Sequence, residues 1–183
     1  MQEEEFKQKV FMDFKYSEIS IKDIRKIKLK LNPKINIPSI SGVYYKKLIT
    51  NIDDRGSLTE IWSDSWKKEP IAKKIAHVYY NTTHEGVIKG WHVHEKTFSQ
   101  YTCVGGSMQV VLVDARKKSK TFGFVDEFLI GKENPSYIKI PPGVLKAWKS
   151  LKGDSVIVNL LTSSDVFDNY KYPFDIILKD VWK

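Results

Sequence analysis

The sequence predicts an all-β domain, folded as an antiparallel sandwich or barrel. From Ser41 onward, short runs rich in Val, Ile, Tyr and Phe alternate with clusters of Gly, Pro, Asn and Asp. About ten such runs follow one another at near-regular spacing, and almost no long helical period appears between them. This pattern is typical of antiparallel sandwiches and barrels.

Length and composition fit one globular domain. The chain has 183 residues, of which 42% are hydrophobic and 13% aromatic, so a disordered chain is excluded. No apolar run approaches the roughly 18 residues of a membrane span, and no membrane partner is expected. The acidic, polar N-terminus does not resemble a secretory signal, and the single cysteine, Cys103, cannot form an intramolecular disulfide. A reducing, cytoplasmic location is therefore expected.

The first 38 residues differ from the rest of the chain. They are rich in Lys, Ile and Glu, lack Gly, and contain one short helix signal around Ser20–Ile27, with Ser20 as its N-cap. We predict that residues 1–38 form an N-terminal arm that packs on a neighbouring or partner subunit. Residues 39–183 would then form the functional domain.

The strands of the predicted barrel follow in chain order, each ended by a turn signal such as Gly105-Gly106 or Lys152-Gly153-Asp154. The C-terminal tail, residues 170–183, is expected to fold back over the barrel. The predicted strands are Gly42–Leu48, Ser57–Trp62, Ala76–Asn81, Val87–His94, Phe98–Val104, Ser107–Asp114, Val125–Ile130, Ser136–Ile140, Ala147–Leu151 and Ser155–Leu161.

The net charge is +8, from 30 Lys and Arg against 22 Asp and Glu. The basic residues are spread along the chain without a recognition helix or a stacking motif, so nucleic acid is not the expected partner. A positive field also suits a smaller anion, such as a nucleotide diphosphate.

The densest group of reactive side chains lies on the predicted strand 87–94. Residues two apart on a strand share a face, so His92 and His94 should point the same way, and Lys89 and Val93 should not. If that face lines the barrel interior, two imidazoles enter one cavity. The alternative is a pair of surface histidines on an edge strand.

This strand, the Gly-Gly that follows it and the run Ile140–Lys146 resemble the two-motif layout of the cupin superfamily. The resemblance implies a small jelly-roll barrel with its site inside. At the third and fourth metal-ligand positions of that layout stand Ser99 and Lys146. Because an ammonium group repels a cation, we expect no metal.

Four runs in register resemble a narrower family, the dTDP-4-dehydrorhamnose 3,5-epimerases. The resemblance implies homodimers that exchange strands, a nucleotide-diphosphate sugar of the 4-keto-6-deoxy class as substrate, and no cofactor. The runs are 53–62, 86–92, 113–123 and 140–144.

The resemblance assigns roles to individual residues. His92 falls on the family's general base, and Asp175 on the carboxylate that orients it. Arg55 and Glu60 match positions that contact the nucleotide. Lys89 stands where the family has a diphosphate-binding arginine, which keeps the charge but loses the bidentate fork.

Further positions are less direct. Asn81 lies near another substrate-facing position. The family's enolate-stabilising lysine is replaced by Ser99, so Lys146 is the candidate to supply that charge. The catalytic tyrosine is missing at its usual place, which leaves Tyr170 as a substitute. His94 stands where the family has glutamine.

Three functions stay open at this point. Proton abstraction next to a C4 ketone, by His92 held by Asp175, indicates a nucleotide-sugar epimerase in surface polysaccharide biosynthesis. The pair of His92 and His94 also suits a sugar 3,4-ketoisomerase, which moves protons between neighbouring atoms. A non-catalytic protein that binds nucleotide sugars is the third reading.

Overall fold

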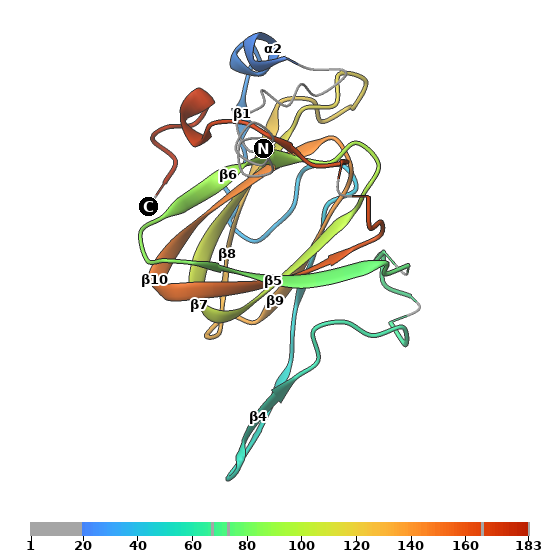
Figure 1. Cartoon of the computed structure of the whole chain (residues 1–183), viewed down its shortest axis with the longest axis vertical. Helices are drawn as coiled ribbons and strands as arrows, with labels where there is room; N and C mark the ends of the chain where they lie inside the picture. The colour runs from blue at the N-terminus through green and yellow to red at the C-terminus, as the bar shows by residue number, and fades with distance from the viewer. Residues whose placement is uncertain (1–19, 67, 73, 166, 183) are drawn as a thin grey trace, which may run out of the picture.

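Two long strands, β7 (Ser99–Asp114) and β10 (Val144–Leu161), pair antiparallel along most of their length and form the spine of a jelly-roll barrel of the cupin type (Figure 1). The structure is a computed structural model that describes residues 20–66, 68–72, 74–165 and 167–182. The predicted all-β jelly-roll fold is confirmed. No helix of the described part of the chain is long and apolar enough to span a membrane.

The remaining elements are short. They are α2 (Ile21–Arg25), β1 (Lys30–Leu31), β2 (Tyr44–Lys47), β3 (Thr50–Asp53), β4 (Gly56–Thr59), β5 (His77–Thr83), β6 (Ile88–Val93), β8 (Phe124–Gly131), β9 (Ser136–Ile140), β11 (Tyr170–Lys171) and the 3-10 helix η1 (Phe174–Ile176).

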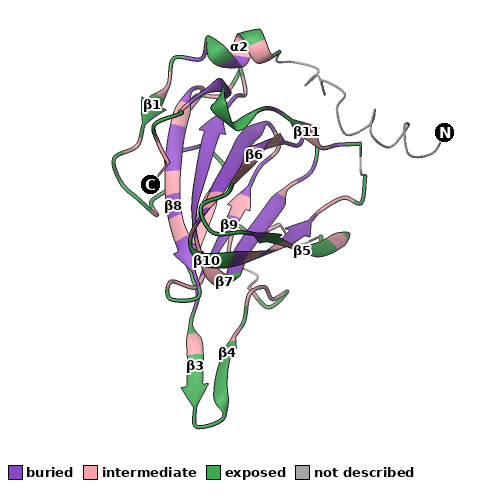
Figure 2. Ribbon diagram, turned by 60° about the vertical axis from the view of Figure 1, so that its left-hand side comes forward, coloured by how far each residue is buried: buried purple, intermediate pink, exposed green. Residues whose placement is uncertain are grey.

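The barrel sheet runs in the order β1-β8-β7-β10-β6-β11. Off this path, β5 pairs with β10, and β9 joins β7 to β2. Strands β3 and β4 pair only with each other in the described chain, as a hairpin that projects from the barrel (Figures 1 and 2). The strand β3 was missed because its polar residues resemble the turn that follows it.

The turns predicted at Gly105-Gly106 and at residues 152–154 are wrong, because β7 and β10 run on through them. The two sites face each other: a Cβ on Gly106 would lie 2.6 Å from the carbonyl oxygen of Asp154. The register of β10 against β7 shifts on either side of Lys152. Glycine thus marks a bend and a close approach of two paired strands, and the chain does not reverse there.

The strand β7 buries both of its faces, as the purple ribbon in Figure 2 shows. Met108, Val110 and Leu112 belong to one core cluster, and Val111 and Val113 belong to a second. The second cluster includes residues from α2 and from the tail 172–182, which confirms that the tail folds back over the barrel.

The described part of the N-terminal arm packs on its own barrel. The helix α2 begins with the predicted Ser20 N-cap, and Ile24 is fully buried in the cluster shared with β7. Ile24 and Ile27 are thus covered by their own chain, whereas Leu31 and Ile37 are 64% and 56% exposed, so the packing of the arm on another subunit stays a prediction. Residues 1–19 lie outside the described residues, and the boundary at residue 38 stays a prediction.

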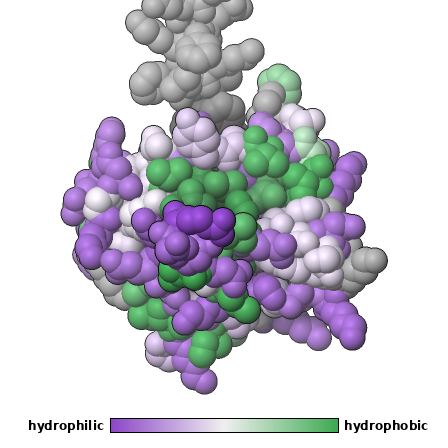
Figure 3. Space-filling model, turned by 90° about the horizontal axis from the view of Figure 1, so that it is seen from below, coloured by the Kyte–Doolittle hydropathy of each residue, from purple (hydrophilic) through white to green (hydrophobic). Residues whose placement is uncertain are grey.

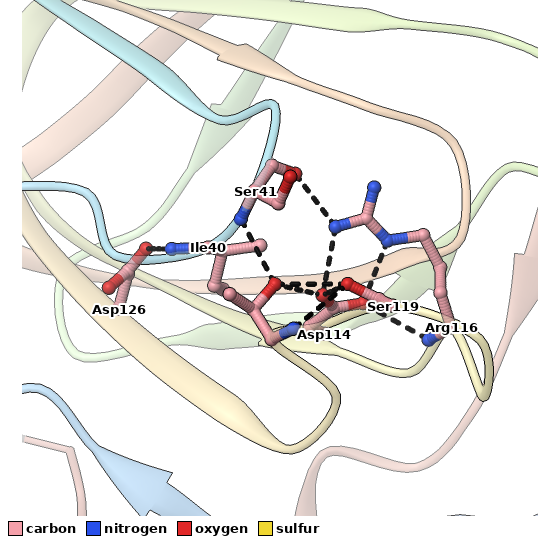
Figure 4. Close-up of polar contacts among 7 residues, drawn as sticks. Ile40, Ser41, Asp114, Arg116, Ser119 and Asp126 are labelled. Carbon is pink, nitrogen blue, oxygen red and sulfur yellow. Dashed lines mark hydrogen bonds and ion pairs between the residues drawn. The ribbon is translucent and has the colours of Figure 1, made fainter.

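Two buried carboxylates, Asp126 and Asp114, tie residues 39–41 to the barrel, and Figure 4 shows their contacts with residues 40 and 41. Asp126 accepts hydrogen bonds from the main-chain N–H groups of Ser39 and Ile40, each at 2.9 Å to Oδ2. Asp114 forms an ion pair with Arg116 at 2.8 Å, and Arg116 donates to the carbonyl of Ser41 at 2.7 Å. These contacts give buried charges the partners that they need.

The approach of β6 to β10 is close enough to require glycine. A Cβ on Gly90 would lie 2.1 Å from Cβ and 2.8 Å from Cα of Ala147. We expect Gly90→Ala to lower the free energy of unfolding by about 3 kcal/mol, because neither strand can move without loss of pairing. Urea denaturation measures the change.

Gly86→Ala is the matched control. Gly86 also has a positive φ, +76°, but a Cβ added there would find no other atom within 4 Å. Its loss should be about 1 kcal/mol, from backbone strain alone. Equal losses for the two variants would contradict the close contact.

Candidate active site

A pocket of about 460 Å³ opens between β5, β6, β7, β10 and the segment 169–171. Both histidines of the predicted pair line it, so they enter one cavity and do not lie on an outer edge. Its lining residues are Tyr79, Asn81, Ile88, Lys89, Gly90, His92, His94, Tyr101, Lys146, Trp148, Asn169 and Lys171.

Lys89 lies in the same pocket as His92, contrary to the face that simple alternation assigns it. Lys146 of β10 pairs with His92 of β6, and Trp148 of β10 pairs with Lys89 of β6. Two steps along β10 thus match three along β6, which is a bulge. The extra residue returns Lys89 to the face of His92. There its Nζ donates to Oδ1 of Asn81 at 2.7 Å and to the carbonyl of Thr82 at 2.5 Å.

His92 lies beside an aromatic ring and across the strands from a lysine. Its ring stacks on that of Trp148, with centroids 5.4 Å apart and planes 18° from parallel. Burial, followed by the charges of Lys146 and Lys171, lowers the pKa of His92 to about 3, while an interaction with the side chain of Asn169 opposes this shift. His92 is therefore a neutral imidazole at physiological pH.

Lys146 is the buried cation of the pocket, with 3% of its surface exposed. It pairs across the strands with His92 on one side and with Leu112 on the other. Burial lowers the pKa of Lys146 to about 7, and the negative charge of Asp168 partly offsets this. The side chain thus occurs in both charge states near neutral pH.

His94 contacts a residue that the sequence did not predict. Its Nδ1 hydrogen-bonds to the main-chain carbonyl oxygen of Asp168. Burial and the charge of Lys146 lower the pKa of His94 to about 4, against the effect of that hydrogen bond. No sequence motif indicated Asp168, because it lies 74 residues further along the chain in an irregular loop.

Two tyrosines that line the pocket were also missed. The hydroxyl of Tyr79 accepts a hydrogen bond from Nδ2 of Asn159 at 2.8 Å, which leaves its own proton to donate. Tyr101 is buried and packs edge-on against Trp148, with centroids 5.8 Å apart. Alternation on β5 could have found Tyr79, since it shares a face with Asn81.

Tyr170 and Asp175 do not reach the pocket lining. Tyr170 lies on β11 and pairs with Val93 of β6, whereas its neighbours Asn169 and Lys171 line the cavity. Asp175 lies on η1 and is exposed. The expected substitution by Tyr170 and the expected carboxylate behind His92 are therefore corrected: the polar neighbour that the tail supplies to His92 is Asn169.

Arg55 and Glu60 lie on the projecting hairpin and just after it, outside this pocket. Arg55 forms an ion pair with Asp53 at 2.6 Å, and 84% of its side chain is exposed. Glu60 accepts a hydrogen bond from Nε1 of Trp66 at 2.7 Å. Within one chain, therefore, these two residues and the histidines are separate.

The pocket has the charge of an anion site. Three lysines line it, Lys89, Lys146 and Lys171, and no Asp or Glu is among the described lining residues. The described residues also contain no group of three or more His, Cys, Asp or Glu placed to hold a metal ion.

A jelly-roll barrel whose pocket is lined by two histidines and three lysines places the chain among the cupins. A family profile described as dTDP-4-dehydrorhamnose 3,5-epimerase matches residues 38–175, and the chain belongs to this family. The family predicted from the four sequence runs is confirmed.

Relatives and solved structures agree with this assignment. The chain is 31% identical over 144 residues to a probable low-salt glycan biosynthesis epimerase, Agl13, of Haloferax volcanii, covering 76% of this chain and 91% of the relative. It is 33% identical over 140 residues to the spore coat polysaccharide biosynthesis protein SpsL of Bacillus subtilis, covering 74% and 91%.

The fold is shared with a solved structure of ChmJ, a 3′-monoepimerase from Streptomyces bikiniensis in complex with dTDP. The TM-score is 0.72 at 22% identity, over 81% of this chain and 80% of that one. Together, the comparisons support the predicted role of a nucleotide-sugar epimerase in polysaccharide biosynthesis.

The suppressed basicity of the histidines makes folding sensitive to acid. The ordinary histidine pKa is 6.5, so between pH 6.5 and about 4 the unfolded chain binds protons that folded His92 and His94 exclude. The free energy of unfolding should therefore fall as pH falls through this window. His92→Phe keeps a ring against Trp148 and removes one titrating group, so the fall should be about half as steep.

Urea titrations at several pH values measure the slope, with His77→Phe as a matched control. His77 lies on β5 outside the pocket lining, and its replacement should leave the slope as in the unchanged protein. A His92→Phe slope equal to that of the unchanged protein would mean that His92 takes up its proton in the folded state.

Proposed function

We propose that this protein epimerises a nucleotide-diphosphate-linked 4-keto-6-deoxy sugar by removing a proton next to the ketone. The observation that carries the proposal is the juxtaposition of His92 and Lys146, which pair directly across β6 and β10 in one buried pocket. Family membership supports the substrate class, and the cationic lining supports a diphosphate.

The chemistry requires a base and a stabilised oxyanion. The neutral imidazole of His92 takes the proton from the carbon beside the ketone and becomes an imidazolium. The C–H electrons form a C=C bond, and the carbonyl oxygen becomes an enolate oxygen. The ammonium of Lys146 stabilises that negative charge. Lys146 thus replaces, from strand β10, the lysine that the family resemblance expects at Ser99.

The basicity of His92 depends on the substrate. In the empty pocket, burial and the positive charges of Lys146 and Lys171 depress its pKa. A bound diphosphate brings two negative charges among those lysines, which raises the pKa of both His92 and Lys146 toward neutrality and above. The substrate itself therefore prepares the base and the cation for the reaction.

Epimerisation also needs a proton donor on the other face of the enolate. The hydroxyl of Tyr79, which accepts from Asn159 and keeps its own proton, suits this role, and Tyr101 is the second hydroxyl of the pocket. Tyr79 lies on β5, which pairs with residues 155–161 of β10, and His92 lies on β6, which pairs with residues 146–149 of the same strand. The proposed donor and base thus come from two different strands, which pair with β10 on either side of its register shift at Lys152.

Binding of the nucleotide part falls to the remaining basic residues. Lys89 is fixed by Asn81 and Thr82, and Lys171 on β11 pairs with His92 on β6. The charges of the two lysines suit the diphosphate. Arg55 and Glu60 would complete the nucleotide site only from a second chain.

A 3,4-ketoisomerase is the second candidate, and one observation favours it: His94 lines the same pocket as His92. Two imidazoles in one cavity could take a proton from carbon and another from the neighbouring hydroxyl. A cofactor is needed by neither reaction, because both are proton transfers.

Exchange of solvent deuterium into the sugar tests the function. With dTDP-4-dehydro-6-deoxyglucose as probe, NMR in deuterium oxide should show incorporation at C3 or C5. His92→Asn should lower the rate at least about 100-fold without unfolding the protein, because the base is lost. His84→Asn, at an exposed histidine paired with Asp154, is the control and should exchange as the unchanged protein does.

The position of the label separates the candidates. Deuterium at C5 supports the epimerase, whereas label at C3 alone requires product NMR to distinguish a 3-epimerase from the ketoisomerase. Binding of the nucleotide sugar without any exchange would overturn the proposal and leave a binding protein.

We further propose that the protein is a homodimer, located in the cytoplasm, in which each hairpin β3–β4 reaches the neighbouring chain. Ile49, Ile52 and Leu58 on or beside the hairpin are 78%, 79% and 65% exposed. Figure 3, viewed from the hairpin's side, shows hydrophobic surface around a hydrophilic foreground. A two-stranded hairpin with uncovered apolar side chains is marginally stable alone, which supports cover by a partner.

Ile52→Asp should convert the dimer into a monomer, because a charge replaces an apolar contact. Sedimentation equilibrium measures the mass, and Lys152→Asp, at an exposed residue on the bend of β10, is the control that should stay dimeric. A monomeric unchanged protein would contradict this arrangement.

A further inference from the structure

We propose that Asp168 is a positioning residue that holds His94 as a proton acceptor facing the sugar. Its catalytic consequence rests on the proposed function, whereas the state of His94 can be measured without any substrate. Asp168 belongs to the loop between β10 and β11, and it is 6% exposed.

The Asp168 carboxylate accepts hydrogen bonds from the segment that connects β6 to β7. Its Oδ1 accepts from the main-chain N–H of Glu95 at 2.6 Å. Its Oδ2 accepts from the main-chain N–H of Lys96 at 3.1 Å and from Oγ1 of Thr97 at 2.5 Å. Three donors from consecutive residues thus fix the chain immediately after His94 to the loop that carries Asp168.

The main chain of Asp168 then sets the tautomer of His94. A carbonyl oxygen only accepts hydrogen bonds, so Nδ1 of His94 must carry the proton in its contact with the Asp168 carbonyl. In a neutral ring, Nε2 is then unprotonated. His94 lines the pocket, and Nε2 lies on the ring edge away from the loop. Nε2 therefore presents its lone pair to the pocket.

Burial and the charge of Lys146 keep the ring neutral. Basic side chains share its pocket from three elements: Lys89 and His92 on β6, Lys146 on β10 and Lys171 on β11. Asp168 is the carboxylate whose charge acts on both His94 and Lys146. One loop residue therefore influences both groups.

A neutral acceptor in this place has a definite use. A hydroxyl of the sugar can donate to Nε2 of His94, which orients the ring for proton removal by His92. In the ketoisomerase reaction, the same nitrogen would take the hydroxyl proton. Either way, a loop that releases His94 misplaces the reacting atoms, which costs rate more than binding.

Asp168→Asn tests the proposal, because an amide keeps the shape but loses the charge and one accepting atom. Asp126→Asn is the matched control, since Asp126 also accepts two main-chain N–H groups and a hydroxyl but holds residues 39–40, which are not part of the pocket lining. Both variants should lose comparable stability, measured by urea denaturation.

Nitrogen-15 NMR of the histidine rings reads the tautomer directly. At pH 7 the unchanged protein should show His94 neutral, with Nδ1 protonated and Nε2 bare. His94→Gln identifies the signal. In Asp168→Asn the His94 signals should move toward a mixture of tautomers, whereas in Asp126→Asn they should stay in place.

Kinetics provide the second measurement. Asp168→Asn should lower kcat about 10- to 100-fold with KM for the nucleotide sugar within about threefold, and Asp126→Asn should change neither. A protonated Nε2 in the unchanged protein overturns the proposal even if no substrate is turned over. Equal loss of kcat in both variants also overturns it, because it would reduce Asp168 to a stability role.

Discussion

The contact between β6 and β10 is the constraint on which the rest of the site depends. Gly90 has no Cβ, so the backbone of β6 can lie close to Ala147 of β10, and the bulge beside it shifts the register of β6 against β10. Because of these two features, Lys89 and His92 share one wall, and Lys146 stands opposite His92. A regular ladder would place Lys89 on the other face and separate the charges.

Under the proposed function, one reaction survives the loss of a residue at its usual position in the sequence. The cation that stabilises an enolate must be near the carbonyl oxygen, but the strand that supplies it is free to vary. Ser99 on β7 is fully buried and carries no charge, whereas Lys146 brings an amine from β10. In the proposed mechanism the charge therefore stays in the pocket, while its source moves from β7 to β10.

The sequence predicted the barrel, the family and the histidine-bearing strand, because alternation and turn residues are local signals. It assigned Lys89 to the wrong face, since a bulge depends on the partner strand. It missed Asp168, whose main-chain carbonyl accepts from His94, because every residue carries such a carbonyl. It also placed Asp175 behind His92, whereas the tail brings Asn169 there. Contacts made across distant loops have no counterpart in sequence spacing.

The crowding of basic groups in the pocket has a consequence for ligand binding. Lys89, Lys146 and Lys171 repel one another when the cavity is empty, and any doubly charged phosphate compound of suitable length relieves that repulsion. Under the proposed function, a free nucleoside diphosphate would satisfy the same charges and would compete with the sugar-bearing form for the pocket.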